Sequence, residues 1–358
     1  MDEQNRKIGH TICCILILSA LFFLSSCSLM PVAREMGNMA LVRTIAVDSG
    51  MGEQWEITLS TGEQGRTSTE LSPSILQGEG NSLSQTLQEI EKKAHSYVFY
   101  GYIDQLLVGQ GVVKLTHILD FFAKNQDFSL GTAIWMAEGT GGKLMAESTE
   151  KRLSTLLEES HLNQAGITKT VGDLLADIKD QKASYIPILA LKNDEIVEIG
   201  YTIIDEGEVV VELKATLADG LELLEGHCGG QLYKLPIEGD VIAELTQVTT
   251  TWIPHYRNGE LDSITCSLDI NANIAETTQA IEEADLKEFA KLLEIKVESR
   301  AKNTIDILQS YHCDAVDIGG KISLKSPMHL KDLEQNWKTD FADVEIKVEG
   351  CINLEVRS

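Results

Sequence analysis

The apolar segment near the start of the sequence lacks the length of a transmembrane helix. Such a helix needs about 20 apolar residues, whereas the uncharged run Ile12–Leu24 has only about 13. A run of this length that follows Arg6 and Lys7 is typical of the h-region of a signal peptide. Residues 1–26 are therefore predicted to be a signal peptide that directs export.

Basic residues are scarce. The sequence has 30 Lys and Arg against 55 Asp and Glu, for a net charge of −25. Nucleic-acid binding depends on neutralising phosphates with Lys and Arg, so this balance argues against a nucleic-acid partner. It also disfavours flat adsorption of the chain onto anionic lipid. Membrane attachment is therefore expected to come from a lipid anchor and not from surface charge.

Catalytic motifs are missing. The sequence contains no HExxH and no GxSxG motif. The glycine-rich stretch Gly139–Lys143 departs from a phosphate loop, because Ala137 replaces the first glycine and Leu144 replaces the Ser or Thr that would bind magnesium. We interpret the stretch as a glycine-rich turn. The sequence predicts no catalytic residue, and hence a protein that is not an enzyme.

The sequence also lacks motifs with the residue spacing that is typical of metal sites. The sequence has no CxxC motif. His227-Cys228 and His312-Cys313-Asp314 contain metal-binding residue types, but neighbouring side chains on a strand point to opposite faces and cannot easily share an ion. We therefore predict no metal site and no bound cofactor.

Cysteines are few after the predicted signal peptide and Cys27. Cys228, Cys266, Cys313 and Cys351 are widely scattered. They could form two disulfides in three different pairings, and the sequence does not choose between these. Buried free thiols are the interpretation that we favour.

Cys27 ends the motif Leu24-Ser25-Ser26-Cys27, which resembles a bacterial lipobox. In lipoproteins the thiol forms a thioether to diacylglycerol, and cleavage before it makes the cysteine the new N-terminus. Two acyl chains hold a protein stably at a membrane, whereas one holds it marginally. We predict lipidation at Cys27, with this covalent lipid as the only attached group. The alternatives are an uncleaved signal anchor and a secreted protein in which Cys27 occurs by chance.

The remaining chain, of about 330 residues, is too long for one small core and predicts two or three domains. An apolar content of 43% is ordinary for a globular protein. We expect a lipidated tether over 27–38, an N-terminal α/β domain over 39–182, a middle domain over 183–238 and a C-terminal α/β domain over 239–358. The polar residues from Lys179 to Ser184 mark the first internal boundary.

Alternating strands and helices predict an α/β or α+β fold. The predicted strands are Ala40–Asp48, Trp55–Ser60, Ile103–Gly109, Ala133–Ala137, Ile186–Leu191, Glu195–Ile204, Val209–Leu213, Val241–Ile253 and Ser263–Ala272. A first helix is predicted to begin at a capping box formed by Ser82 and Gln85. Further helices are predicted over His117–Lys124, Leu153–Ser160, Val171–Asp180 and Ala215–Leu224. Residues 64–80 are expected to be an exposed loop.

The C-terminal domain has the clearest pattern. A long amphipathic helix is predicted over 279–311, with an apolar stripe at helical spacing. The stripe consists of Leu286, Phe289, Leu293, Val297, Ala301, Leu308 and Tyr311. A strand with one buried and one exposed face is predicted over 344–356. Gly350 occupies an apolar position of that strand, which predicts a bulge or a close backbone approach.

Several blocks, taken together, resemble the Ger(x)C family of spore germination lipoproteins. They are the stretch Arg34–Asp48, the block Gly101–Phe122, the block Glu198–Leu213, the Asp-to-Gly loop Asp314–Gly319, and Trp337 and Phe341 before the last strand. The resemblance follows the family's order over the whole chain after Cys27. It departs from the family pattern at Ser28-Leu29, at Gly200-Tyr201-Thr202 and at Asp317, where a glycine is usual.

The resemblance implies a three-domain Ger(x)C-like fold, in which each domain has a central β-sheet with packed helices. It also implies the C subunit of a nutrient germinant receptor, which acts without catalysis beside A and B subunits in the spore inner membrane, on its extracytoplasmic face. The resemblance is also compatible with an indirect role with small-molecule germinants, and it leaves open whether this subunit binds the germinant directly. The alternative is a solute-binding lipoprotein of a nutrient importer, which would need a hinged cleft with placed polar groups. An extracytoplasmic enzyme is a third hypothesis, for which motifs are missing.

The lipobox generates the first prediction. We expect Cys27→Ala to abolish metabolic labelling with palmitate and to release the protein from the membrane fraction, because the thiol is the only predicted attachment point for lipid. Cys14→Ala, inside the predicted signal peptide, is the matched control and should leave labelling unchanged. Undiminished labelling of Cys27→Ala would contradict the prediction.

Overall fold

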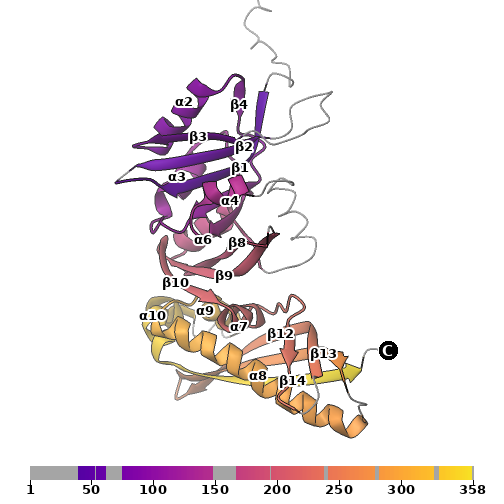
Figure 1. The fold of residues 1–358 in the computed structure, drawn as a ribbon. Helices are drawn as coiled ribbons and strands as arrows, with labels where there is room; N and C mark the ends of the chain where they lie inside the picture. The colour runs from indigo at the N-terminus through magenta and orange to yellow at the C-terminus, as the bar shows by residue number, and fades with distance from the viewer. Residues whose placement is uncertain are drawn as a thin grey trace, which may run out of the picture. The chain divides into compact units, whose positions relative to one another are not determined.

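A computed structural model describes residues 39–52, 54–61, 75–147, 167–193, 195–237, 241–278, 282–325 and 330–356. The described strands form two sheets, one of ten strands and one of four (Figure 1). The predicted signal peptide, the tether and the helix predicted over 153–160 lie outside the described residues.

The first sheet is built from the N-terminal and middle parts of the chain. Its strands are β1 (Met39–Ser49), β2 (Trp55–Thr61), β3 (Ile75–Gly80), β4 (Tyr97–Phe99), β5 (Gln105–Gly109), β6 (Ala133–Ala137), β7 (Lys169–Thr170), β8 (Ser184–Lys192), β9 (Glu195–Asp205) and β10 (Glu208–Lys214). The strand order is β10-β9-β8-β6-β5-β1-β2-β3, with β4 beside β1 and β7 beside β6. The central strands β1, β5, β6 and β8 run parallel, and the outer pairs are antiparallel.

The centre of this sheet is apolar on both faces, as expected for parallel strands that helices cover on each side. In β5, Leu106, Leu107 and Val108 are all fully buried. Leu106 and Val108 belong to a core with helices α2 (Leu83–Lys93), α3 (Thr116–Lys124) and α6 (Val171–Lys179). Leu107 faces α4 (Gly141–Glu147) on the other side.

Local sequence fixes where these helices begin. The Ser82 hydroxyl accepts a hydrogen bond from the Gln85 N–H at 3.2 Å, which confirms the predicted helix start. The Gln85 side chain reaches back to the Asn81 N–H at 3.3 Å. At α6, Thr170 and Asp173 form a full capping box that the sequence analysis did not predict.

The second sheet contains the strands β11 (Leu232–Lys234), β12 (Val241–Arg257), β13 (Glu260–Thr277) and β14 (Glu345–Val356), in that order. The tight turn between β12 and β13 has positive φ angles at Asn258 and Gly259, the combination that two-residue hairpins need. β14 runs parallel to β13 and is reached through helices α8 (Glu283–Ser310), α9 (Ile318–Ser323) and α10 (Leu330–Asp343). Helix α8 packs along β14 (Figure 1).

One hydrophobic core joins the two sheets through helix α7 (Thr216–Leu224). Tyr185 and Tyr201 of the first sheet belong to the same buried cluster as Leu221 of α7 and Leu293 of α8. Helices α7 and α8 approach so closely at Gly220 that a Cβ atom there would lie 2.2 Å from the Thr304 hydroxyl oxygen. The strands β8 to β10 therefore pack on the C-terminal part of the chain through side chains and not only through a linker.

The mixed α/β class and most of the predicted elements are confirmed. The loop predicted over 64–80 is wrong at its end, where residues 75–80 form β3 and pair with β2. Besides β3, six elements were not predicted: β4, α4, β7, β11, α9 and α10. Residues 183–238, expected as a separate middle domain, add β8, β9 and β10 to the first sheet and β11 to the second. The exact domain boundaries stay a prediction.

The C-terminal patterns are confirmed with two differences. On α8, Phe289, Leu293, Val297 and Ala301 are buried as predicted, but Tyr311 lies just beyond the helix end and is exposed. The register of β13 with β14 is continuous through Gly350, so no bulge occurs there. The close-approach alternative is confirmed, because a Cβ atom on Gly350 would lie 3.1 Å from the Glu294 side chain.

The four described cysteines are free. Cys228, Cys266 and Cys313 are buried, as we favoured, whereas Cys351 is exposed on β14. Burial raises the pKa of Cys266 to about 12 and that of Cys313 to about 11. Among the described residues, no helix combines the length and the hydropathy needed to span a bilayer.

The buried face of α8 generates the second prediction. We expect Leu293→Asp to lower the free energy of unfolding by several kcal/mol, because an unpaired carboxylate would replace a fully buried side chain. Leu324→Asp makes the same change at a side chain that is 84% exposed and should leave stability nearly unchanged. Thermal unfolding of the two variants is the measurement, and equal melting temperatures would contradict the prediction.

Candidate functional site

Asp48, at the end of β1, caps the start of α4. Its two carboxylate oxygens accept hydrogen bonds from the Gly141 and Gly142 N–H groups, at 2.7 and 2.9 Å. Burial raises the pKa of Asp48, and these two donors oppose that rise. Gly109 leaves room for the carboxylate, since a Cβ atom there would lie 2.0 Å from an Asp48 oxygen. We call this arrangement the Asp48 cap.

The Asp48 cap explains why the glycine-rich stretch near 139–143 does not act as a phosphate loop. In a phosphate loop the backbone N–H groups at a helix start point at the ligand. Here the N–H groups of Gly141 and Gly142 are already bonded to the Asp48 carboxylate. The structure shows a left-handed turn at Gly139 and then helix α4, so the predicted turn is confirmed but ends earlier than expected.

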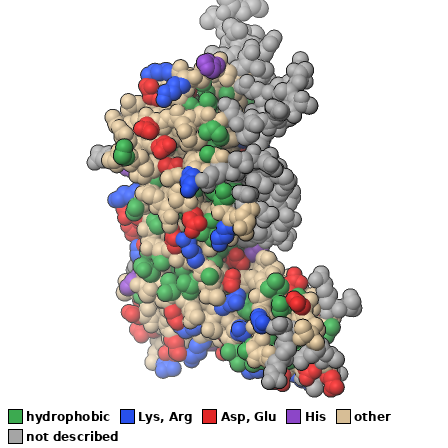
Figure 2. Space-filling model, viewed as in Figure 1, with side chains coloured by type: hydrophobic (Ala, Val, Ile, Leu, Met, Phe, Trp, Pro, Cys, Tyr) green, Lys and Arg blue, Asp and Glu red, His purple; other side chains and the backbone are tan. Residues whose placement is uncertain are grey.

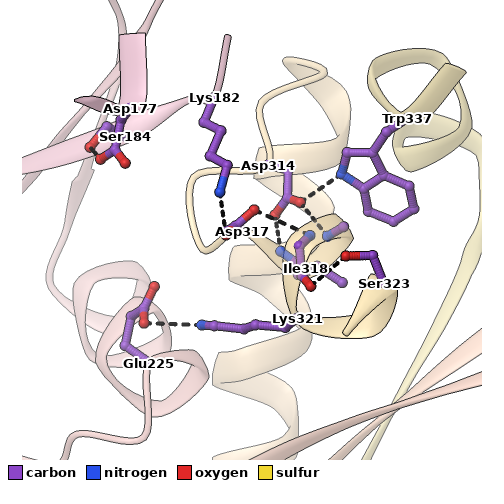
Figure 3. Close-up of polar contacts among 12 residues, drawn as sticks. Asp177, Lys182, Ser184, Glu225, Asp314, Asp317, Ile318, Lys321, Ser323 and Trp337 are labelled. Atoms are coloured by element: carbon purple, nitrogen blue, oxygen red, sulfur yellow. Dashed lines mark hydrogen bonds and ion pairs between the residues drawn. The ribbon is translucent and has the colours of Figure 1, made fainter. Parts of the chain in front are cut away.

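Asp314 forms an equivalent cap at α9. Its carboxylate accepts hydrogen bonds from the Ile318 and Gly319 N–H groups, both at 2.9 Å, and from the Trp337 indole N–H at 2.7 Å (Figure 3). Burial raises the pKa of Asp314 to about 6, against the opposing effect of these donors. A Cβ atom on Gly319 would lie 2.5 Å from the Trp337 ring, so glycine is required for this contact. We call this arrangement the Asp314 cap.

Asp317 links the Asp314 cap to the first sheet. Its φ angle of 52° is left-handed, which explains why a glycine would suit the position and why an Asp is tolerated there. The carboxylate accepts a hydrogen bond from Lys182 Nζ at 2.8 Å, and this contact raises the pKa of Lys182 (Figure 3). Lys182 lies in the turn between α6 and β8.

Two further lysines make the same kind of connection. Lys338 of α10 lies 2.6 Å from Asp205 and 3.1 Å from Glu206, in the turn between β9 and β10. Lys321 of α9 lies 3.1 Å from Glu225, just after α7. These ion pairs are partly exposed, and each contributes at most about 1 kcal/mol. Structurally, these ion pairs hold the turns that carry Lys182 and Asp205 against α9 and α10.

A cavity of about 650 Å³ lies among these contacts. Its walls include Lys182, Asp205, His312, Asp317, Trp337 and Lys338. The lysines in the wall are already paired with the carboxylates in the wall. The junction between β8–β10 and α9–α10 is therefore a candidate site whose charged wall residues hold the two parts together through ion pairs.

A partly buried polar network centres on Tyr201 and Glu222. The Tyr201 hydroxyl donates to Glu222 at 2.9 Å and accepts from the Ile167 N–H at 3.1 Å. Gln231 donates to the second oxygen of Glu222 at 2.7 Å. Burial raises the pKa of Glu198 to about 8, and the neighbouring Glu222 charge acts in the same direction. This network connects β9 to α7 with paired polar groups.

The candidate residues from the sequence lie apart. Cys27 is outside the described residues. His227 and Cys228 do not face a common partner, since the Cys228 thiol contacts the Leu245 carbonyl oxygen at 3.6 Å. The described residues contain no group of three His, Cys, Asp or Glu side chains that could hold a metal ion. On the face shown in Figure 2, acidic and basic side chains are interspersed.

Sequence reasoning missed the contacts of Lys182, Lys321 and Lys338. Each pairs with a carboxylate more than 90 residues away in the chain, so no local spacing could reveal it. The Asp-to-Gly loop Asp314–Gly319 was identified only as a family block, and its physical role as a cap became visible in the structure.

The Asp314 cap generates the third prediction. We expect Gly319→Ala to destabilise the fold by about 1–3 kcal/mol, because the added methyl group would overlap the Trp337 ring. Gly111→Ala is the matched control, since its Cβ atom would meet only Ser49 at 3.6 Å. The measurement is the denaturant midpoint of each variant. Equal midpoints would show that Trp337 does not constrain the glycine.

Comparison with known proteins gives two family matches and a similarity to solved structures. The family model for the spore germination protein N-terminal domain matches residues 33–191. The family model described as spore germination B3/GerAC like, C-terminal, matches residues 199–356. No curated protein sequence matches the chain.

A solved structure, titled "Crystal Structure of the GerBC protein", has a similar fold. The TM-score is 0.58 at 16% sequence identity, over 88% of this chain and 97% of that chain. At this identity the likeness concerns the fold, and the family assignment comes from the two domain matches. The chain belongs to the GerAC-like family of spore germination proteins, which are non-catalytic C subunits of germinant receptors associated with the spore membrane.

Proposed function

We propose that this protein is a lipid-anchored receptor subunit that is required for nutrient-triggered spore germination. In this proposal Cys27 carries diacylglycerol, and the folded part of the chain lies on the extracytoplasmic face of the spore inner membrane. It acts by association with the A and B subunits of one receptor and carries out no chemical step. The domain boundaries near residues 182 and 238 belong to the same proposal.

One observation carries the proposal. The two family matches occur in the family's order and together extend from residue 33 to residue 356, interrupted only at residues 192–198. They begin a few residues after the lipobox cysteine, Cys27. The predicted signal peptide and the lipobox cysteine thus precede the two matched domains in the order that this proposal requires.

The internal contacts support a role in association. The carboxylates of Asp48 and Asp314 are bonded to backbone N–H groups inside the fold. Lys182 and Lys338 are bonded to carboxylates of neighbouring turns. Because these polar groups stabilise the fold itself, a partner would be recognised by other, exposed side chains.

The lipid anchor would make a modest interface sufficient. Confinement to a membrane raises the effective concentration of the protein for partners in the same membrane, in the way that a linker does for two tethered modules. An exposed surface that binds weakly in solution can then be occupied at the membrane. This reasoning predicts that loss of the anchor impairs function while the fold remains intact.

The fourth prediction tests this function in spores. We expect deletion of the gene to abolish or slow germination with nutrients, while germination by agents that bypass receptors stays normal. Complementation with the unaltered gene should restore the nutrient response, and complementation with Cys27→Ala should restore it poorly. The measurement is the loss of optical density of a spore suspension after each trigger.

Two results would contradict the proposal. Deletion spores that respond normally to every nutrient mixture, in a strain without a second copy of the gene, would exclude the receptor role. Impaired uptake of one nutrient by growing cells would instead support the solute-binding lipoprotein of an importer.

A further inference from the structure

Among the strands that the structure describes, none pairs with the outer edge of β14 in the second sheet. β14 pairs with β13 on one side and is the last strand of the sheet in the described part of the chain. The Gly350 N–H is bonded to the Glu298 carboxylate at 2.8 Å and therefore points away from β13. Backbone groups of alternate residues point to the same side of a strand. Ile346, Val348 and Ile352 thus also present their N–H and C=O groups to the open edge.

A groove of about 610 Å³ follows this edge. Its walls are the first residues of β14, including Ile346 and Val348, and the α8 residues Ile295, Glu298 and Lys302. The Ile295 side chain is 53% exposed, although it lies next to the otherwise covered apolar face of the sheet. Unpaired strand edges with neighbouring apolar side chains are places where another strand can add.

The exposed face of β14 shows which strand fits. Its side chains are Glu345, Lys347, Glu349, Cys351, Asn353 and Glu355. If a second copy of β14 adds in the antiparallel direction, a two-fold axis passes through one residue, and side chains equally far from that residue face each other. Like charges placed directly opposite each other are destabilising, so the charges select the position of the axis.

The two-fold axis can pass through one of four central residues, 349 to 352. At three of these positions, carboxylates of the two copies would lie directly opposite each other. An axis on Glu349 places that residue opposite itself. An axis on Gly350 places Glu345 opposite Glu355, and an axis on Ile352 places Glu349 opposite Glu355. Each of these registers is disfavoured by like-charge repulsion.

An axis on Cys351 avoids every such clash. It places Lys347 opposite Glu355 and Glu349 opposite Asn353, and two-fold symmetry repeats each pair. We propose that β14 pairs with β14 of a second copy of this chain, antiparallel and with the two-fold axis on Cys351, so that the two four-stranded sheets become continuous. The proposal is independent of the receptor function.

The hydrogen-bonding pattern agrees with this axis. Even-numbered residues face the open edge, so Val348 and Leu354 of opposite copies form a hydrogen-bonded pair. The Gly350 N–H, now held by Glu298, bonds to the Ile352 carbonyl oxygen of the second copy instead. Ile295 and Val356, which are 53% and 51% exposed, lie next to the added strand.

Cys351 reports on the register. With the two-fold axis at this position, Cys351 of one copy lies directly opposite Cys351 of the other copy. The two residues form a non-hydrogen-bonded pair, in which the Cα atoms lie about 4.5 Å apart. This separation is within the range that a disulfide spans. Cys228, Cys266 and Cys313 are buried and serve as internal non-reacting thiols.

The test is thiol cross-linking of the full-length lipidated protein in membranes, with copper phenanthroline and oxygen as the oxidant. We expect a covalent dimer that disappears in Cys351→Ser. Lys347→Glu should lower the dimer yield about tenfold, because two opposite-charge pairs become like-charge pairs. The double variant Lys347→Glu with Glu355→Lys restores both pairs and should restore the yield.

A control places a thiol elsewhere on the same sheet. Ile253→Cys, in a Cys351→Ser background, puts a thiol on an exposed position of β12 and should give no dimer. Absence of a Cys351-dependent dimer would overturn the proposal. So would a dimer whose yield is unaffected by Lys347→Glu, or a Cys351 cross-link to a different protein in place of a second copy.

Discussion

The core around α7 is the constraint on which the rest of the structure depends. Tyr185 and Tyr201 present one face of the first sheet to this core, and Leu221 of α7 and Leu293 of α8 fill it from the C-terminal side. Burial of apolar surface is the dominant favourable contribution to folding, so the two sheets form one cooperative structure rather than two independent ones. The turns that carry Lys182 and Asp205, and the partners of those residues, are held in place by this packing.

Two aspartates, the buried Asp48 and the half-buried Asp314, solve the same local problem in the two halves of the chain. Asp48 lies near the end of β1 and Asp314 follows α8, and each bonds to two successive backbone N–H groups at the start of a short helix. In each case a glycine supplies the space, Gly109 beside Asp48 and Gly319 beside Trp337. The blocks that contain Asp48 and Asp314 therefore have a physical basis in helix starts, where these residues stabilise the scaffold.

The sequence predicted the elements whose pattern is local. The apolar stripe that contains Leu293 was sufficient to place α8, and the alternation of apolar and polar residues over 344–356 was sufficient to place β14. The sequence could not predict β3, because strand pairing with β2 and not its own composition makes residues 75–80 extended. It also could not predict the contact of Lys182 with Asp317, because the two residues are 135 positions apart and only the fold brings them together. The only predicted site residue, Cys27, lies outside the described residues.

The central claim is that the protein works by association with the other subunits of a germinant receptor. Its most direct test is affinity purification of the tagged, full-length protein from solubilised spore membranes, followed by identification of the bound proteins. The account predicts recovery of a multi-span A subunit and a transporter-like B subunit, absent from a parallel purification of an untagged strain. Recovery of an importer's permease and ATPase, or of neither receptor subunit under conditions that preserve other membrane complexes, would contradict it.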